Sequence, residues 1–200
     1  MSGRPLLVLI GGATGTGKST VAAELAERLG IETVTCTDAV RQRLRSFFPP
    51  ELMPSIQGSS FEAGDAFPEA DDPLAYGFLQ QARDVLHGLR PALDSGESLV
   101  LEGVHLVPGL VAPPAAAVVV QCVLAIPDEA EHERNFHARA SSERPRTRYL
   151  RRFAEIRRIQ ELLVERARRE DVPVLENGDP DEIATALAER VREAVAREAA

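Results

Sequence analysis

The sequence is poor in cysteine, in net positive charge and in long apolar runs, and each shortage excludes a class of protein. Its two cysteines, Cys36 and Cys122, lie in apolar runs without metal-ligand spacing, so we expect small core residues in a reducing compartment. The formal net charge of -8 argues against nucleic acid as a partner, because binding to a phosphate backbone favours a basic domain. The apolar stretch 110–120 is interrupted by two prolines and is too short to span a bilayer.

A targeting segment is also missing from the beginning of the chain. Arg4 is the only basic residue before the first apolar run, and that run leads directly into a glycine loop instead of a cleavage site. We therefore expect a soluble cytoplasmic protein without a membrane partner. The length of 200 residues fits a single domain over residues 1–200 with a full core, and leaves open whether the protein is a monomer or a homodimer.

Lysine is the rarest basic residue, since Lys18 is the only lysine among 23 lysines and arginines. It lies inside a glycine-rich loop, where the composition has not replaced it with arginine. A compact ammonium on a flexible stem fits between phosphate groups where a planar guanidinium does not. The retained lysine therefore indicates a phosphate-binding loop.

The loop itself carries the clearest motif of the sequence. Residues 12–19 read Gly-Ala-Thr-Gly-Thr-Gly-Lys-Ser and match the pattern G-x-x-x-x-G-K-[ST] in full, between an apolar run and a helical pattern. Glycines allow backbone N–H groups to converge on a β-phosphate, Lys18 reaches the β- and γ-phosphates, and the Ser19 hydroxyl binds Mg²⁺. We predict a site for ATP or GTP with Mg²⁺, formed by Gly12, Ala13, Thr14, Gly15, Thr16, Gly17, Lys18, Ser19 and Thr20.

Short apolar runs alternate with segments of helical spacing, which predicts an α/β fold with a parallel sheet. Asp38 is expected to cap the helix that follows it, and residues 48–73 are expected to form a loop-rich insertion over the active site. The expected strands are 6–10, 32–36, 98–101, 117–126 and 172–175. The expected helices are 19–29, 39–47, 74–93, 128–138, 150–169 and 183–195.

Two acidic residues follow expected strands and are candidates for catalysis. Asp38 comes after the second strand and Glu102 after the third. Ligands of parallel α/β sheets bind at the carboxyl ends of the strands, so both side chains should face the loop of Lys18. One can accept the proton of an acceptor hydroxyl while the other belongs to the Mg²⁺ shell. We assign Asp38 to the acceptor and Glu102, with Ser19, to the metal.

Four further residues are candidates for contacts to the acceptor, each with a plainer alternative. Arg41 lies one turn after Asp38 and can clamp an anion, or be a surface arginine. Ser59 and Ser60 can donate hydroxyls to a substrate phosphate, or be ordinary loop residues. His105 follows Glu102 closely and can touch substrate, or only complete the strand.

Arginines concentrate in and before residues 139–149, which we expect to form a polar loop that closes as a lid. Such a lid can deliver positive charge to the transferring phosphate from within the same chain. Arg139 and Arg146 are the candidates for this catalytic role. The arginines of the group are Arg134, Arg139, Arg144, Arg146 and Arg148.

Three longer segments carry a resemblance to a known family. The runs 11–20, 37–41 and 102–109, the last of which reads Glu-Gly-Val-His-Leu-Val-Pro-Gly, resemble the 2-phosphoglycerate kinase family in the same order. The runs 156–160 and 173–177 are similar too, so the resemblance covers most of the chain. It implies the three-layer P-loop NTPase fold of nucleoside-monophosphate kinases, with strand order 2-3-1-4-5 and a lid.

The resemblance further implies an ATP-dependent phosphotransferase that converts 2-phosphoglycerate to 2,3-bisphosphoglycerate. It also implies a short form without an N-terminal regulatory region, because the phosphate loop begins at residue 12. Within residues 48–73 only 59–63 match, so a sugar, nucleoside, hydroxy acid or antibiotic stays open as the acceptor. The other open function is a nucleotide-dependent switch without an acceptor.

Overall fold

A parallel β-sheet forms the centre of the computed structural model, which describes residues 4–138 and 146–198. Within these residues the sheet has five strands in the order β2-β3-β1-β4-β5, which confirms the predicted order. Both β3 and β4 pair with β1. Because β1 and β3 are parallel neighbours, their carboxyl ends lie close together. The strands are β1 (Leu6–Gly12), β2 (Val34–Cys36), β3 (Leu99–Glu102), β4 (Val118–Ala125) and β5 (Val174–Glu176).

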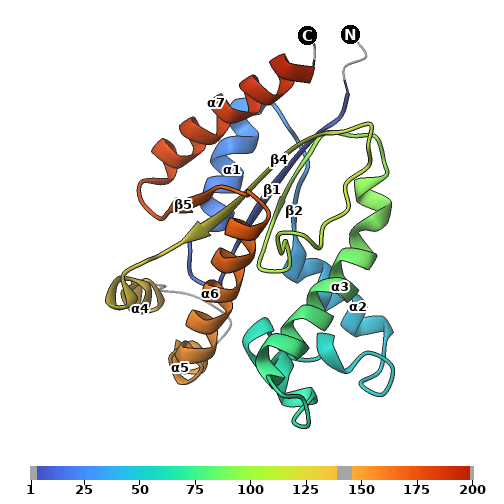
Figure 1. The fold of residues 1–200 in the computed structure, drawn as a ribbon, viewed down its shortest axis with the longest axis vertical. Coiled ribbons are helices and arrows are strands. Elements are labelled where there is room, and N and C mark those ends of the chain that lie inside the picture. The colour runs from blue at the N-terminus through green and yellow to red at the C-terminus, as the bar shows by residue number, and fades with distance from the viewer. Residues whose placement is uncertain (1–3, 139–145, 199–200) are drawn as a thin grey trace.

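Helices cover both faces of the sheet and give the protein three layers (Figure 1). Helices α1 (Lys18–Leu29) and α7 (Pro180–Glu198) lie on one face, where they share an apolar cluster with Val8 and Ile10. Helix α3 (Pro73–Leu93) lies on the other face with Leu7 and Leu9, beside α6 (Phe153–Arg169). Alternate residues of β1 thus face opposite layers, which explains why this strand is a continuous apolar run.

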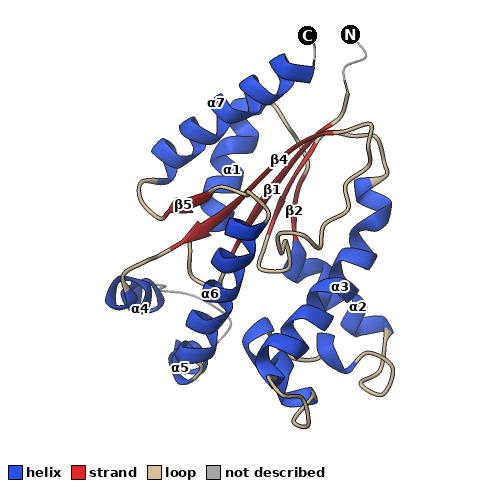
Figure 2. Ribbon diagram, viewed as in Figure 1, coloured by secondary structure: helices blue, strands red, loops and turns tan. Residues whose placement is uncertain are grey.

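The predicted insertion, residues 48–73, extends below the sheet beside α2 (Thr37–Phe47) and the first half of α3 (Figures 1 and 2). It contains two short 3₁₀ helices, η1 (Pro54–Ile56) and η2 (Ser60–Ala66), and is otherwise irregular. Helix α3 passes so close to η2 that a Cβ on Gly77 would lie 2.3 Å from the Ala63 carbonyl oxygen. A glycine is therefore needed where the insertion packs on the helix.

Three element predictions need correction. The second helix begins at Thr37, so Asp38 lies in its first turn and is not its N-cap. Residues 146–149 are not loop, because they belong to α5 (Arg146–Arg151). The helix predicted over 150–169 is interrupted at Arg152, and α6 starts only at Phe153. No glycine or proline marks this break; aromatic contacts of Tyr149 and Phe153 with Phe136 on α4 (Glu129–Ala138) accompany it.

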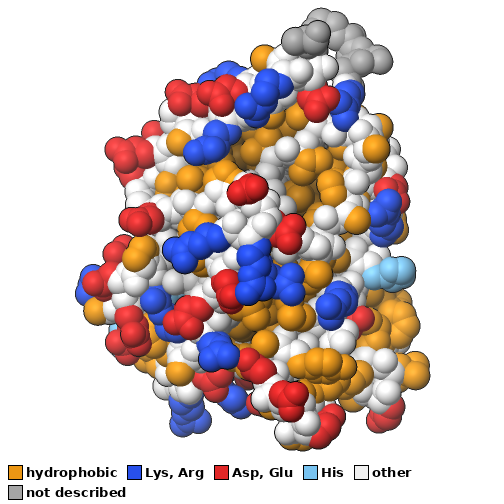
Figure 3. All heavy atoms as spheres, in the orientation of Figure 1, with side chains coloured by type: hydrophobic (Ala, Val, Ile, Leu, Met, Phe, Trp, Pro, Cys, Tyr) orange, Lys and Arg blue, Asp and Glu red, His pale blue; other side chains and the backbone are white. Residues whose placement is uncertain are grey.

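The surface in Figure 3 mixes acidic and basic side chains, with apolar patches between them. Among the residues that the structure describes, no helix combines the length and apolar character needed to cross a membrane.

Candidate active site

The phosphate loop connects β1 to α1 at the carboxyl end of the sheet. Its backbone turns through left-handed conformations at Gly15 (φ 95°) and Gly17 (φ 82°), which side-chain-bearing residues rarely adopt. At Gly12 an added Cβ would lie 2.5 Å from the Leu124 carbonyl oxygen, so this glycine is required by close packing on β4. The structure thus forms the loop that the motif predicted.

Lys18 begins α1, and its ammonium folds back over the loop. The side chain is only 9% exposed, and Nζ donates to the Ala13 carbonyl oxygen at 2.6 Å. The Thr16 hydroxyl donates to the same carbonyl at 3.0 Å and lies 3.4 Å from Nζ. The ammonium is therefore held at the centre of the loop, where it can meet the phosphates of a nucleotide.

Glu102 ends β3 and meets the beginning of α1. The Ser19 hydroxyl donates to Glu102 Oε1 at 3.0 Å, and Glu102 is 5% exposed. Strand order brings the two together, because β3 is the direct neighbour of β1. A hydroxyl and a carboxylate are the oxygen ligands that Mg²⁺ prefers, and nucleotide phosphates complete its shell. Among the described residues, no three His, Cys, Asp or Glu side chains form a cluster that could hold a metal by themselves.

Cys36 is a residue of this site that the sequence analysis assigned only to the core. It ends β2 and lines the same pocket as Glu102. Burial, and then the charge of Glu102 and a hydrogen bond to it, raise the pKa of the Cys36 thiol to about 11. The thiol therefore stays protonated and donates to the carboxylate. The sequence feature that could have indicated this role is the position of Cys36 at the end of an expected strand, close to Asp38.

A pocket of about 200 Å³ extends from the loop and is called here the phosphate pocket. It brings together loop residues, both predicted acids and both predicted serines. Its lining consists of Thr14, Gly15, Lys18, Ser19, Cys36, Asp38, Ser59, Ser60, Phe61, Glu102, Gly103, Val104 and Tyr149.

Asp38, which lines this pocket, forms an ion pair with Arg41. Arg41 Nε donates to Asp38 Oδ1 at 2.8 Å, and Gln42 donates to Oδ2 at 2.7 Å. Arg41 is 3% exposed and also donates to the Ile56 and Gly58 carbonyl oxygens at 2.9 and 2.8 Å. Three hydrogen bonds of Arg41 thus orient Asp38 and hold the insertion against α2.

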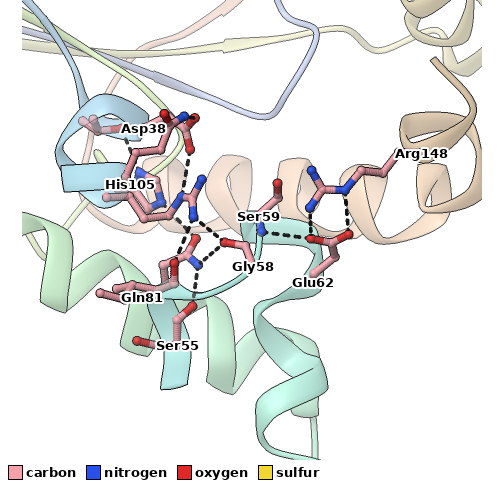
Figure 4. Close-up of polar contacts among 12 residues, drawn as sticks. Asp38, Ser55, Gly58, Ser59, Glu62, Gln81, His105 and Arg148 are labelled. Carbon is pink, nitrogen blue, oxygen red and sulfur yellow. Dashed lines mark hydrogen bonds and ion pairs between the residues drawn. The ribbon is translucent and has the colours of Figure 1, made fainter. Parts of the chain in front are cut away.

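His105 is fully buried and does not line the phosphate pocket, which favours the structural alternative for this residue. Its Nε2 donates to Gln81 Oε1 at 3.0 Å, and the Thr37 hydroxyl donates to Nδ1 at 2.8 Å. Gln81 in turn donates to the Ser55 and Gly58 carbonyl oxygens (Figure 4). The pKa of His105 is lowered to about 3, mainly by burial. The charge of Asp38 raises this pKa, and the charges of Arg41 and Lys18 lower it further. A neutral imidazole therefore connects α2, α3 and the insertion.

A second pocket of about 400 Å³ adjoins the first and is called here the arginine pocket. It shares Ser59 with the phosphate pocket and carries three guanidinium groups. Its lining consists of Arg41, Gln42, Arg45, Ser46, Gly58, Ser59 and Arg148.

Arg148 reaches this pocket from α5 and pairs with Glu62 of η2 (Figure 4). Its Nε donates to Glu62 Oε1 at 2.8 Å, and its Nη2 donates to Oε2. Burial would raise the pKa of Glu62, but hydrogen bonds from Arg148 and the Ser59 N–H, with nearby arginine charge, lower it on balance. The bidentate pair therefore joins the insertion to α5 beside the pocket.

The predicted lid is only partly described. Arg139 and Arg144 lie outside the described residues, and so does the side chain of Arg146. Arg134 lies exposed on α4. The catalytic roles of Arg139 and Arg146 remain predictions, whereas Arg148 is placed at the arginine pocket.

Comparison with known proteins identifies the family. The family model described as "AAA domain" matches residues 8–148. A 2-phosphoglycerate kinase of Methanopyrus kandleri is 40% identical over 189 residues, covering 89% of this chain and 58% of that protein. Its counterpart from Thermococcus kodakarensis is 40% identical over 195 residues, covering 94% and 67%. The chain thus spans about three-fifths to two-thirds of the length of these curated relatives.

Solved structures agree on the fold. A sugar kinase from Janibacter sp. HTCC2649 aligns with a TM-score of 0.56 at 16% identity, covering 96% of this chain and 98% of that one. Shikimate kinase from Acinetobacter baumannii aligns with a TM-score of 0.50 at 17% identity, covering 95% and 94%. These two show a shared fold, while the sequence relatives show descent: the chain belongs to the 2-phosphoglycerate kinase family of P-loop proteins.

Proposed function

We propose that this protein transfers the γ-phosphate of ATP to a hydroxyl of a small anionic acceptor, and that the acceptor is 2-phosphoglycerate, giving 2,3-bisphosphoglycerate. The observation that carries the proposal is the Ser19–Glu102 pair, 3.0 Å apart at the loop, in one pocket with Asp38. A metal-binding pair and a second acid beside a phosphate loop are the parts that phosphoryl transfer needs. The names of the sequence relatives support this acceptor.

The nucleotide side fits ATP with Mg²⁺. Backbone N–H groups of the loop and the beginning of α1 would bind the β-phosphate, and Lys18 would reach the γ-phosphate. Ser19 and Glu102 would hold Mg²⁺, which, when bound, neutralises charge on the β- and γ-phosphates. The Cys36 thiol, held neutral, adds a hydrogen bond to Glu102 without adding charge.

The acceptor side fits an anion. The arginine pocket adjoins the phosphate pocket at Ser59, so a small molecule can place a hydroxyl in one and its charged groups in the other. We assign the carboxylate and phosphate of the acceptor to Arg45 and Arg148, with Ser59 where the two pockets meet and Ser60 in the phosphate pocket. Arg41 supports this arrangement from below by holding Gly58 and Asp38.

Transfer then requires little beyond positioning and charge. The acceptor oxygen forms a bond to the γ-phosphorus as the bond to the ADP oxygen breaks, and the hydroxyl proton passes to Asp38. Lys18 stabilises the charge that develops on the transferring group. Arg139 and Arg146 are the candidates for additional charge from the lid.

A panel of acceptors tests the proposal. ATP, Mg²⁺ and the protein are mixed with 2-phosphoglycerate, 3-phosphoglycerate, glycerate, shikimate, gluconate or a nucleoside, and ADP formation is followed with identification of the product by phosphorus NMR. We expect 2-phosphoglycerate to react fastest and to give 2,3-bisphosphoglycerate. A faster reaction with a neutral acceptor would overturn the acceptor assignment. Equal ADP formation with and without every acceptor would favour a nucleotide switch.

A further inference from the structure

Helix α4 supports the phosphate loop from outside the phosphate pocket. His132 Nε2 lies 2.8 Å from the Thr14 carbonyl oxygen, and Asn135 Nδ2 donates to the Gly15 carbonyl oxygen at 3.3 Å. These two residues are 118 and 120 positions away from their partners in the sequence. Two consecutive carbonyl groups of the loop are therefore held by one helix.

Peptide geometry converts these contacts into an effect on the pocket. In a trans peptide the carbonyl oxygen and the following N–H point in opposite directions, and the described residues contain no cis peptide bond. With the Thr14 carbonyl turned toward α4, the Gly15 N–H points away from α4, and Thr16 follows in the same way. Gly15 lines the phosphate pocket, so its N–H becomes available to phosphate oxygens there, and the Thr16 N–H is the next one along the loop.

His132 is itself fixed as a donor. It is fully buried, with its ring stacked on Phe136 at 5.5 Å and edge-on to Phe153 at 5.5 Å. Its Nδ1 faces Arg157 Nη1 at 3.4 Å, and Arg157 also donates to the Ile126 and Pro127 carbonyl oxygens. Because a guanidinium cannot accept a hydrogen bond, Nδ1 is the unprotonated nitrogen and Nε2 carries the hydrogen.

Gly15 supplies an independent sign of this arrangement. The loop motif leaves its position free, yet the residue is a glycine with φ of 95°. An added Cβ would lie 2.7 Å from Phe136 Cζ and 3.0 Å from His132 Nε2. The choice of glycine is therefore explained by the close approach of α4 and by the backbone conformation.

We propose that His132, with a smaller contribution from Asn135, is a positioning residue that orients the Thr14 and Gly15 peptides so that the following N–H groups face the nucleotide phosphates. The proposal rests on the proposed function only in that the loop binds a nucleoside phosphate. It is independent of the acceptor.

Calorimetric titration with ADP tests the proposal on three variants, each checked for its melting temperature. His132→Leu should weaken ADP binding by about tenfold, because loop N–H groups that bind charged phosphates are no longer pre-oriented. His132→Gln, whose amide can donate, should recover most of the affinity. The matched control His137→Leu, an exposed residue of the same helix, should bind ADP like the wild type. In turnover assays, His132→Leu should raise the KM for ATP and leave that for the acceptor unchanged.

The outcomes separate this proposal from the proposed function. If His132→Leu lowers the melting temperature but binds ADP like the wild type, His132 only packs, and the proposal is wrong. If His132→Leu does not fold, Asn135→Ala carries the test, with about threefold weaker ADP binding expected and unchanged binding overturning the proposal. A wild-type protein that does not bind ADP at all would overturn the proposed function together with this one.

Discussion

The phosphate pocket and the arginine pocket share Ser59 but are built from different material. The first contains a glycine loop, the beginning of α1 and Glu102, which strand pairing brings close, beside side chains of α2, the insertion and α5. Side chains from α2, the insertion and α5 form the second. A site made of backbone depends on contiguous residues, whereas a site made of side chains depends on how distant segments pack.

The difference predicts separable functions, with nucleotide binding on one side and recognition of the acceptor on the other. A variant in one pocket should disturb one ligand and spare the other. Lys18 is the exception, because its ammonium stabilises the transition state and a variant there should slow the phosphoryl transfer itself.

Lys18→Ala should have the largest effect. Loss of the ammonium at the centre of the loop should lower phosphoryl transfer by about 10²-fold or more, since charge on the transferring group is no longer stabilised. The fold should survive, which circular dichroism and thermal melting can check. Turnover close to that of the wild type in a folded variant would contradict the assignment of the loop.

Arg148→Gln should have the next largest effect, on the acceptor alone. Removing one guanidinium from the arginine pocket should raise the KM for 2-phosphoglycerate by about tenfold or more, the cost of a charge-assisted hydrogen bond. The affinity for ADP should stay unchanged. Arg151→Gln, at an exposed arginine of the same helix, is the matched control. An equal loss for both variants, or a loss of ADP affinity, would place Arg148 outside acceptor recognition.

His105 yields a smaller effect, on stability. Its pKa is lowered to about 3 from an ordinary 6.5, so between these pH values His105 is protonated in the unfolded chain and neutral in the folded protein. Stability should therefore fall as the pH drops from about 6.5 toward about 3, with a slope of up to about 1.4 kcal/mol per pH unit. Urea unfolding of His105→Gln at several pH values should show a shallower decline than the wild type. Identical pH dependence in the two proteins would mean that His105 is not held neutral by burial.

The sequence was informative where function follows from adjacent residues. The phosphate loop is one contiguous motif, and Asp38 and Glu102 are recognisable because each lies at or just after the carboxyl end of a strand, at the same edge of the sheet. The strand order came from the family resemblance. The beginning of α2 at Thr37 and the break at Arg152 were missed, because neither has a capping residue or a glycine to mark it.

The sequence did not indicate which side chains would pair with one another. Arg148 pairs with Glu62 across 86 residues, and His132 meets Thr14 across 118. Arg41 was a candidate for holding an anion; it lines the arginine pocket, and its Nη1 also donates to two carbonyl oxygens of the insertion. In each case the residue type was visible, and its partner depended on packing between segments far apart in the chain.

Asp38 and Glu102 are proposed to have different roles, and a titration of Mg²⁺ against turnover distinguishes them. Glu102→Gln should raise the Mg²⁺ concentration needed for half-maximal activity, because Glu102 lies beside Ser19. Asp38→Asn should lower kcat or raise the KM for the acceptor and leave the Mg²⁺ requirement unchanged, since Asp38 pairs with Arg41, which lines the arginine pocket. A shift of the Mg²⁺ requirement in Asp38→Asn, with none in Glu102→Gln, would contradict these roles.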